Sequence, residues 1–197
     1  MPNIVNTYVS FHQINDEGKK KWNEMCERFK DWNDEKAHSF PLSQIWGLPE
    51  SDDGPGTYSW NVENMGSKWA FLQDPSDESF LIESAWSCPT DALQYICEEI
   101  TAVDPDFIMT ASAQDEMPNW IASYVFGGGE LYDYHQREWE EIRDYMNEQY
   151  SELAEHYDEE EEDWDEDGRD IMYDVIWECC GDLMDSDLNY MLTEMKE

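Results

Sequence analysis

A helical pattern that passes into a run of carboxylates, between His135 and Asp170, is the feature that most restricts how this chain can fold. Apolar residues recur there at steps of three or four, which keeps side chains on one side of an α-helix. They are Trp139, Ile142, Met146, Tyr150, Leu153 and Tyr157. A neighbouring stripe is acidic and consists of Glu141, Glu148, Glu152, Glu155 and Glu159. The pattern predicts one helix of about 23 residues, roughly 35 Å long, with one side on a core and a row of negative charge on another.

The net charge of the whole chain limits its partners. The 197 residues include 48 Asp and Glu against 11 Lys and Arg, which gives a formal net charge of −37. Residues 135–197 contain 24 of these acids and four of the bases, so the acid is densest at the C-terminal end. Nucleic acid and anionic membranes attract positive charge, so we expect the protein to bind neither directly. The expected partners are basic: a nucleic-acid-binding protein, a polyamine or a metal ion.

Aromatic and cysteine content favours a folded cytoplasmic protein. Aromatic residues make up 14% of the chain, with ten Trp, which argues against a disordered acidic tail. The five cysteines lack any CxxC spacing, which favours reduced thiols, and the pair Cys179-Cys180 is expected on a helix surface. The N-terminal residues lack the basic start and apolar run of a signal peptide, and no stretch approaches 18 apolar residues. We therefore expect a cytoplasmic protein without a membrane-spanning segment.

The order of strand and helix patterns in residues 1–134 predicts an α+β fold. Alternating β-branched and aromatic residues predict strands near 3–13, 68–73, 79–86, 107–113, 120–126 and 130–134. Helical spacing predicts one helix from about Asn15 to Trp32 and another from Thr90 or Asp91 to just before Asp104. Residues 33–57 are typical of a loop with one short helical turn.

This order, β-α-β-β-α-β plus an extra strand, is that of a ferredoxin-like antiparallel sheet with two helices on one face. Two C-terminal helical segments follow, the second with a predicted break or kink at Gly181. The sequence thus predicts a ferredoxin-like domain at 1–134 and an acidic helical extension, 135–197, packed on it.

Two short motifs carry a resemblance to a known family. Asn64–Trp69 (NMGSKW) and Glu83–Pro89 (ESAWSCP) resemble the W-G-T-K-W and T-A-W-S-P-P elements of the YubB-type ferredoxin-like domain of plasmid and bacteriophage proteins. Substitutions relative to that pattern are Met65, Ser67 and Cys88. The resemblance covers about residues 3–134 and implies a ferredoxin-like fold and a mobile-element origin, but no catalytic residues. We expect Trp69 and Trp86 to be architectural, on strands that cross the core.

One segment matches part of a calcium-binding template. Asp163, Asp165, Asp167, Gly168 and Asp174 stand at positions 1, 3, 5, 6 and 12 of an EF-hand loop. Position 8, normally apolar, is Asp170, and position 12 is Asp rather than a bidentate Glu. We expect at most weak Ca²⁺ binding, through Asp163, Asp165, Asp167 and Asp174, and no other cofactor. The four histidines lack metal-ligand spacing and no nucleophile motif is present, so the sequence predicts no enzyme.

The charge pattern itself predicts a nucleic-acid mimic. Acids three, four and seven positions apart on a helix lie roughly 5 to 11 Å apart, the scale of phosphate spacing on a duplex. The first hypothesis is a phage- or plasmid-type inhibitor that, as a DNA mimic, blocks the nucleic-acid site of a basic host defence or nucleic-acid-processing protein. Its phosphate-mimicking residues would be Glu141, Asp144, Glu148, Glu152, Glu155, Asp158, Glu159, Glu160, Glu161, Glu162, Asp163, Asp165, Glu166 and Asp167.

Two other hypotheses remain open. The second is a protein–protein adaptor that binds through exposed tryptophans, with the acid serving only solubility. Its anchors would be Trp32, Trp46, Trp60, Trp120 and Trp164. The third is a weak divalent-cation-binding protein that uses residues 163–174. Neutralising the helix acids should spare an adaptor, whereas Trp→Ala substitutions should not.

Overall fold

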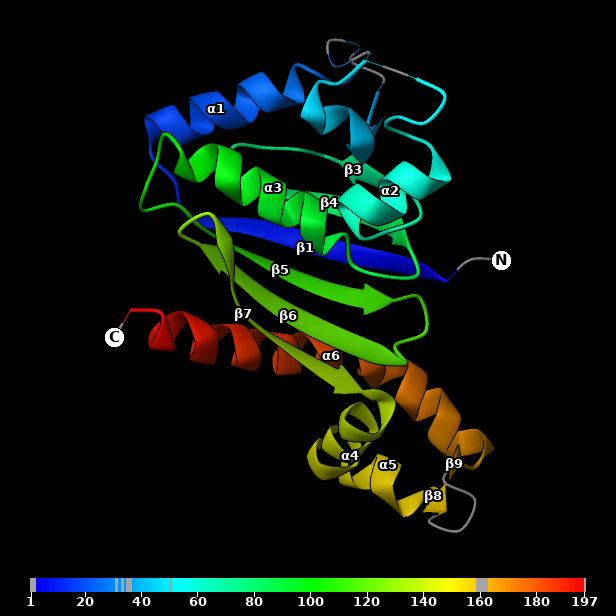
Figure 1. The fold of residues 1–197 in the computed structure, drawn as a ribbon. Helices are drawn as coiled ribbons and strands as arrows, with labels where there is room; N and C mark the ends of the chain where they lie inside the picture. Colours follow the sequence, from blue (N-terminus) through cyan, green and yellow to red (C-terminus); the bar gives the residue numbers. More distant parts are fainter. Residues whose placement is uncertain are drawn as a thin grey trace.

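The chain folds around one seven-stranded antiparallel sheet, in the order β2-β3-β4-β1-β5-β6-β7 (Figure 1). The computed structural model describes residues 3–30, 32, 34, 37–49, 51–158 and 163–196. The strands of the sheet are β1 (Ile4–Gln13), β2 (Ser39–Pro41), β3 (Ala70–Gln73), β4 (Ser79–Ala85), β5 (Ile108–Asp115), β6 (Trp120–Gly127) and β7 (Glu130–Glu138). A separate short ladder joins β8 (Tyr157–Asp158) to β9 (Asp163–Trp164). The expected α+β class is therefore confirmed.

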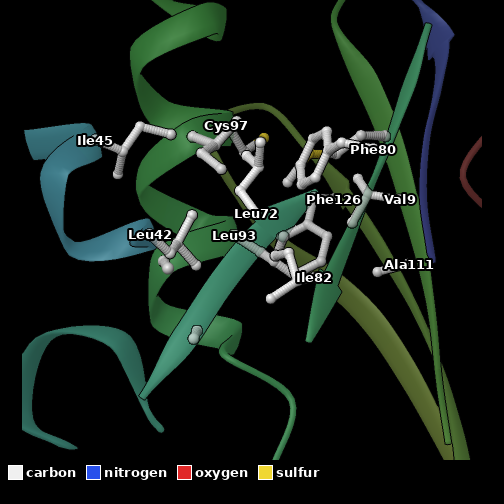
Figure 2. Close-up of a cluster of buried hydrophobic side chains, with 14 of the residues drawn as sticks. Val9, Leu42, Ile45, Leu72, Phe80, Ile82, Leu93, Cys97, Ala111 and Phe126 are labelled. Carbon is white, nitrogen blue, oxygen red and sulfur yellow. The ribbon is translucent and has the colours of Figure 1, made fainter. Parts of the chain in front are cut away.

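Helices cover one face of the sheet along most of its width (Figure 1). They are α1 (Asp16–Cys26), the 3₁₀ helix η1 (Leu42–Trp46), α2 (Tyr58–Met65) and α3 (Thr90–Thr101). α1 begins at Asn15, whose side chain accepts hydrogen bonds from the backbone N–H groups of Glu17 and Gly18. The main core lies between these helices and the sheet. Figure 2 shows its centre, where Leu93 and Cys97 of α3 meet Phe80 and Ile82 of β4.

The opposite face of the sheet is covered only in part. The C-terminal helices are α4 (Trp139–Gln149), α5 (Ser151–Glu155) and α6 (Glu166–Glu194). α6 runs along β6 and β7 (Figure 1), and a second core cluster forms where α4, α5 and α6 meet Ile121 of β6. The Ser123 hydroxyl of β6 donates a hydrogen bond to the Met184 carbonyl of α6. Helices thus lie on both faces, but α6 leaves part of its face uncovered.

Several sequence-based boundaries differ from the structure. The sheet has seven strands rather than the six predicted from residues 1–134, because β2 also joins it beside β3, and β7 runs on to Glu138 instead of ending near Tyr134. Residues 33–57, expected to be a loop with one short helical turn, contain that turn as η1 but also β2, and α2 follows at Tyr58, where no helix was predicted. The first helix ends at Cys26 rather than near Trp32. The expected break at Gly181 is absent, because α6 continues through it to Glu194.

The predicted single helix over residues 135–157 is wrong. Residues up to Glu138 belong to β7, where Arg137 pairs with Ile121 of β6. The helix begins only at Trp139, after Glu138 and Glu141 form a reciprocal capping box. It ends at Tyr150, whose φ of −118° and ψ of 90° are extended, and α5 follows as a separate turn. Pairing with β6 at one end and the break at Tyr150 therefore divide the predicted helix into three elements.

All five cysteines are free and buried. Cys179 and Cys180 lie on α6, as expected for a helix, but both are buried rather than on its surface. None of the described helices is both long and apolar enough to cross a membrane.

Candidate functional site

α6 presents an unbroken row of six exposed acidic side chains. They recur at steps of three or four and are Asp167, Asp170, Asp174, Glu178, Asp182 and Asp185. At about 100° and 1.5 Å per residue, the row stays within roughly a third of the helix circumference and spans about 27 Å. The opposite side of the same helix is buried, through residues such as Met172, Ile176 and Leu183. The row therefore points into solvent along the length of one continuous helix. We call these six residues the α6 acidic row.

Local interactions hold α6 as a single rigid element. At its start, the side chain of Asp165 caps the helix by accepting a hydrogen bond from the Gly168 N–H at 2.9 Å. Further along, the carboxylate of Asp187 accepts two hydrogen bonds from Arg137 of β7, from Nε at 2.9 Å and from an Nη at 2.6 Å. Asp187 is buried and also lies 3.0 Å from His135 Nδ1. The row is therefore fixed in space relative to the sheet.

The acids of α4 continue this surface. Glu141, Asp144 and Glu148 are exposed on α4, which packs beside α6. Acids of both helices affect two tyrosines, Tyr145 on α4 and Tyr150 at its C-terminal end. Asp182 of α6 and, more weakly, Glu148 of α4 act on Tyr145, and Glu178 of α6 acts on Tyr150. Partial burial, followed by the charge of Asp182, raises the pKa of Tyr145. Partial burial, followed by the charge of Glu178, raises the pKa of Tyr150. The negative charges of α4 and α6 thus act on the same space.

Cations neutralise some of the acids but not the α6 acidic row. Arg137 lies 3.5 Å from Glu141, Arg143 lies 2.8 Å from Asp144, and Arg169 lies 3.3 Å from Asp163. Within the part of the chain that the structure describes, none of the six acids of the row forms an ion pair. The row is therefore free to interact with cations of a partner.

The structure distributes the predicted phosphate-mimicking residues over several elements. Glu141, Asp144 and Glu148 lie on α4, while Glu152 and Glu155 lie on α5 beyond the break at Tyr150. The other described ones are exposed near the start of α6: Asp158 in β8, Asp163 in β9, Asp165 at the N-cap, and Glu166 and Asp167 in the first turn. The predictions for Glu159, Glu160, Glu161 and Glu162 fall outside the described residues. The acids from Glu141 to Glu155 are thus not one rigid row, contrary to expectation.

The calcium template does not adopt the conformation that an EF-hand loop requires. Residues from Glu166 onward are helical, so Asp167 and Asp174 lie on α6 instead of wrapping around an ion. Asp163 pairs with Arg169, and Asp165 caps α6 while its carboxylate lies 3.0 Å from His156 Nδ1. Among the described residues, no three His, Cys, Asp or Glu side chains are grouped as a metal site.

The tryptophans expected to be adaptor anchors are not exposed. Trp164 is buried, with its Nε1 donating to Asn147, and Trp32, Trp46, Trp60 and Trp120 are half-buried. The exposed tryptophans are instead Trp86, at 63%, and Trp177, at 47%. The prediction that Trp86 is architectural is therefore wrong. It follows β4 with a left-handed φ of +76°, which non-glycine residues rarely adopt.

Beyond Asp167, the α6 acidic row was not among the predicted phosphate-mimicking residues, and only Asp174 was singled out, as a calcium ligand, although the spacing of the row is visible in the sequence. Acids at steps of three or four alternate there with the apolar series Met172, Ile176, Cys179 and Leu183. The loop expected at residues 163–174 and the break expected at Gly181 divided this segment, so one continuous helix was not predicted there.

Comparison with known protein families, curated proteins and solved structures finds nothing that matches this chain.

Proposed function

We propose that this protein is a nucleic-acid mimic that occupies the nucleic-acid-binding site of a basic protein and blocks it. The observation that carries the proposal is the α6 acidic row on one fixed helix. Six carboxylates over about 27 Å give roughly one charge per 5 Å, and one strand of a duplex carries about one charge per 3.4 Å. The exposed acids of α4 add further charge beside the row.

Rigidity distinguishes such a mimic from a merely solubilising surface. A basic cleft gains most from carboxylates whose backbone positions are set before binding, because less conformational freedom is then lost on association. The buried face of α6, the cap at Asp165 and the Arg137–Asp187 pair all favour this fixed arrangement. A solubilising surface needs no such fixed helix. The high negative charge also accelerates encounter with a basic partner.

We further propose that β3, β4, β1 and β5, with α1 and α3, form a ferredoxin-like unit that β2, β6 and β7 extend. The adjacent positions β3-β4-β1-β5 and their antiparallel pairing support this topology. Together with the resemblance to the YubB-type domain, the topology supports a plasmid or bacteriophage origin. The five free, buried cysteines support a role in the cytoplasm of the host cell.

The proposal is tested with two variants of equal net charge. In the first, four acids of the α6 acidic row are neutralised (Asp170→Asn, Asp174→Asn, Glu178→Gln, Asp182→Asn). In the control, four exposed acids elsewhere are neutralised (Asp52→Asn, Asp53→Asn, Glu63→Gln, Asp106→Asn). Each immobilised protein captures partners from a bacterial lysate at low salt, and a salt step elutes them.

The expected result is a set of DNA- or RNA-binding proteins captured by the wild type and the control but not by the row variant. In a fluorescence anisotropy assay, the wild-type protein should displace a labelled duplex from them. The displacement should weaken steeply with salt, because each neutralised phosphate contact contributes to the salt dependence. Equal capture by both variants, or displacement that is insensitive to salt, would overturn the proposal.

An adaptor is the second candidate function, and Trp86 is the observation that favours it. Its exposed side chain forms part of the wall of a shallow pocket of about 340 Å³, which Tyr58 and Lys68 also line. Left-handed backbone at a non-glycine residue stores strain, and such strain concentrates at functional sites. Tryptophan is also enriched at interface hot spots. If Trp86→Ala removes the captured proteins and the row variant does not, the protein is an adaptor.

A further inference from the structure

A groove of about 410 Å³ lies between α6 and the uncovered part of the sheet. α6 contributes Trp177, Gly181 and Asp185 to its lining, and β1 and β5 contribute Tyr8, Ser112 and Gln114. Tyr8 and Ser112 are paired neighbours in the sheet, so they project from the same face. The groove forms because α6 packs over β6 and leaves the outward side chains of β1 and β5 open.

Gly181 keeps the groove open on the side of α6. A Cβ added at this position would meet no heavy atom within 4 Å. The empty space lies between Trp177 and Asp185, which are one turn before and one turn after Gly181 on the same side of the helix. Glycine within a helix costs about 1 kcal/mol relative to alanine, and here it leaves room for a ligand.

The lining combines aromatic rings, hydrogen-bonding groups and one carboxylate. Tyr8 is 57% exposed and Trp177 is 47% exposed, so both rings are accessible from the groove. Ser112 and Gln114 offer hydrogen-bond donors and acceptors from the strands. His12, at the same groove, has its pKa lowered by burial and by Lys196, so it is largely uncharged at pH 7. Asp185 is therefore the charged side chain that lines the groove at neutral pH.

We propose that this groove binds an arginine side chain presented by an extended segment of a basic partner. The guanidinium pairs with Asp185, and its stem lies in the space beside Gly181. The flanking part of the segment packs against Trp177 and Tyr8. Guanidinium is suited to this lining because it forms bidentate bonds with carboxylates and stacks on aromatic rings, whereas an ammonium forms neither contact as well.

Charge complementarity selects this occupant over the alternatives. A second copy of the chain would bring another net charge of −37 to the surface, and an anionic ligand would face the same repulsion. A cationic segment is instead attracted, both by Asp185 and by the other five acids of the α6 acidic row. The site shares Asp185 with that row but goes beyond the proposed mimicry, because a single arginine occupies it without a nucleic-acid-like interface.

The experiment uses the full chain and the singly charged peptide N-acetyl-Gly-Arg-Gly-amide as probe. Binding is followed by heteronuclear NMR, through the indole N–H signal of Trp177. The expected result is saturable binding that is at least about tenfold weaker for the matching lysine and citrulline peptides. Equal affinity for the citrulline peptide, or no saturable binding up to about 10 mM, would overturn the proposal.

Variants locate the site. The Cβ of a side chain at position 181 meets no neighbour, so Gly181→Leu should place its larger side chain in the open space and abolish binding, whereas Gly181→Ala should retain it. Asp185→Asn should weaken binding about tenfold, and Asp174→Asn, the same change elsewhere on α6, should not. The four-acid row variant leaves Asp185 intact and should still bind the peptide, so failure of the row hypothesis and failure of this site are distinguished. Unchanged binding by Gly181→Leu would refute the assignment.

Discussion

Replacing Asp187 by alanine tests what holds α6 on the sheet. The Asp187 side chain is 8% exposed, and it accepts two hydrogen bonds from Arg137 at 2.9 and 2.6 Å. Removing one partner of a buried ion pair costs about 3–5 kcal/mol, because the remaining charge is left without compensation. Arg137 is 21% exposed and keeps Glu141 at 3.5 Å, which lowers the cost. We therefore expect a loss of about 2–3 kcal/mol in the free energy of unfolding.

Urea unfolding at 25 °C measures this loss, provided that the free energy of unfolding falls with urea concentration at the same slope in the wild type and the variant. For a chain of this length the expected decrease in Tm is about 4–12 °C. Asp174→Ala is the matched control, because it removes an exposed carboxylate from the same helix and makes the same gain in helix propensity. A difference between the two variants below about 0.5 kcal/mol would refute the reasoning. The double variant with Arg137→Ala should lose clearly less than the sum of the single losses.

Four further predictions follow from the geometry. Gly181→Ala should raise the free energy of unfolding by about 1 kcal/mol in the same urea assay, because the new methyl group meets no neighbour; a loss would show that the helix is strained there. Asp165→Ala should cost about 1 kcal/mol because it removes the cap of α6, while Asp165→Asn should cost much less. The hydrogen bond between His156 and Asp165 raises the pKa of His156 and lowers that of Asp165. The pair therefore stabilises the fold most between pH 3.8 and 6.5, the ordinary pKa values, and this stabilisation is lost as Asp165 is protonated at lower pH or His156 is deprotonated at higher pH. NMR titration should give His156 a pKa above 6.5, and Asp165→Asn should return that pKa towards 6.5. Burial raises the pKa of Cys179 to about 11 and that of Cys180 to about 12, so a disulfide reagent at pH 8 should label neither until the protein is unfolded; rapid labelling of the native protein would contradict their burial.

The elements that could be predicted from the sequence are those with a long, regular pattern of apolar side chains. β1 and α3 were placed to within a few residues, because alternation in one and helical spacing in the other extend over several turns or pleats. β2, with three residues, gives no periodic signal and is defined only by its pairing with β3. Short elements of this kind depend on their neighbours, so one sequence does not reveal them.

Long-range contacts explain the larger differences. Residues 135–138 have helical spacing, but their pairing with β6 places them in the sheet, where Arg137 reaches Asp187 fifty positions later. The exposure of Trp86 is also tertiary in origin, since its backbone N–H donates to the Asn3 carbonyl at 3.0 Å and its left-handed φ turns the chain away from the sheet. The α6 acidic row, in contrast, needed only the assumption of an unbroken helix, which the spacing of its buried residues already supports.

The central position of β1 has a consequence for how the chain is synthesised. β1 ends at Gln13, but its two neighbours are β4 and β5, and β5 is complete only at Asp115. At about 5–20 residues per second, the ribosome needs roughly 5–20 s to supply the second neighbour. During that interval an apolar strand has at least one free edge, the condition in which nascent chains aggregate. Acidic residues spread along the emerging segment repel other chains over the same seconds, so the charge that is proposed to attract a basic partner also protects the chain before it has folded.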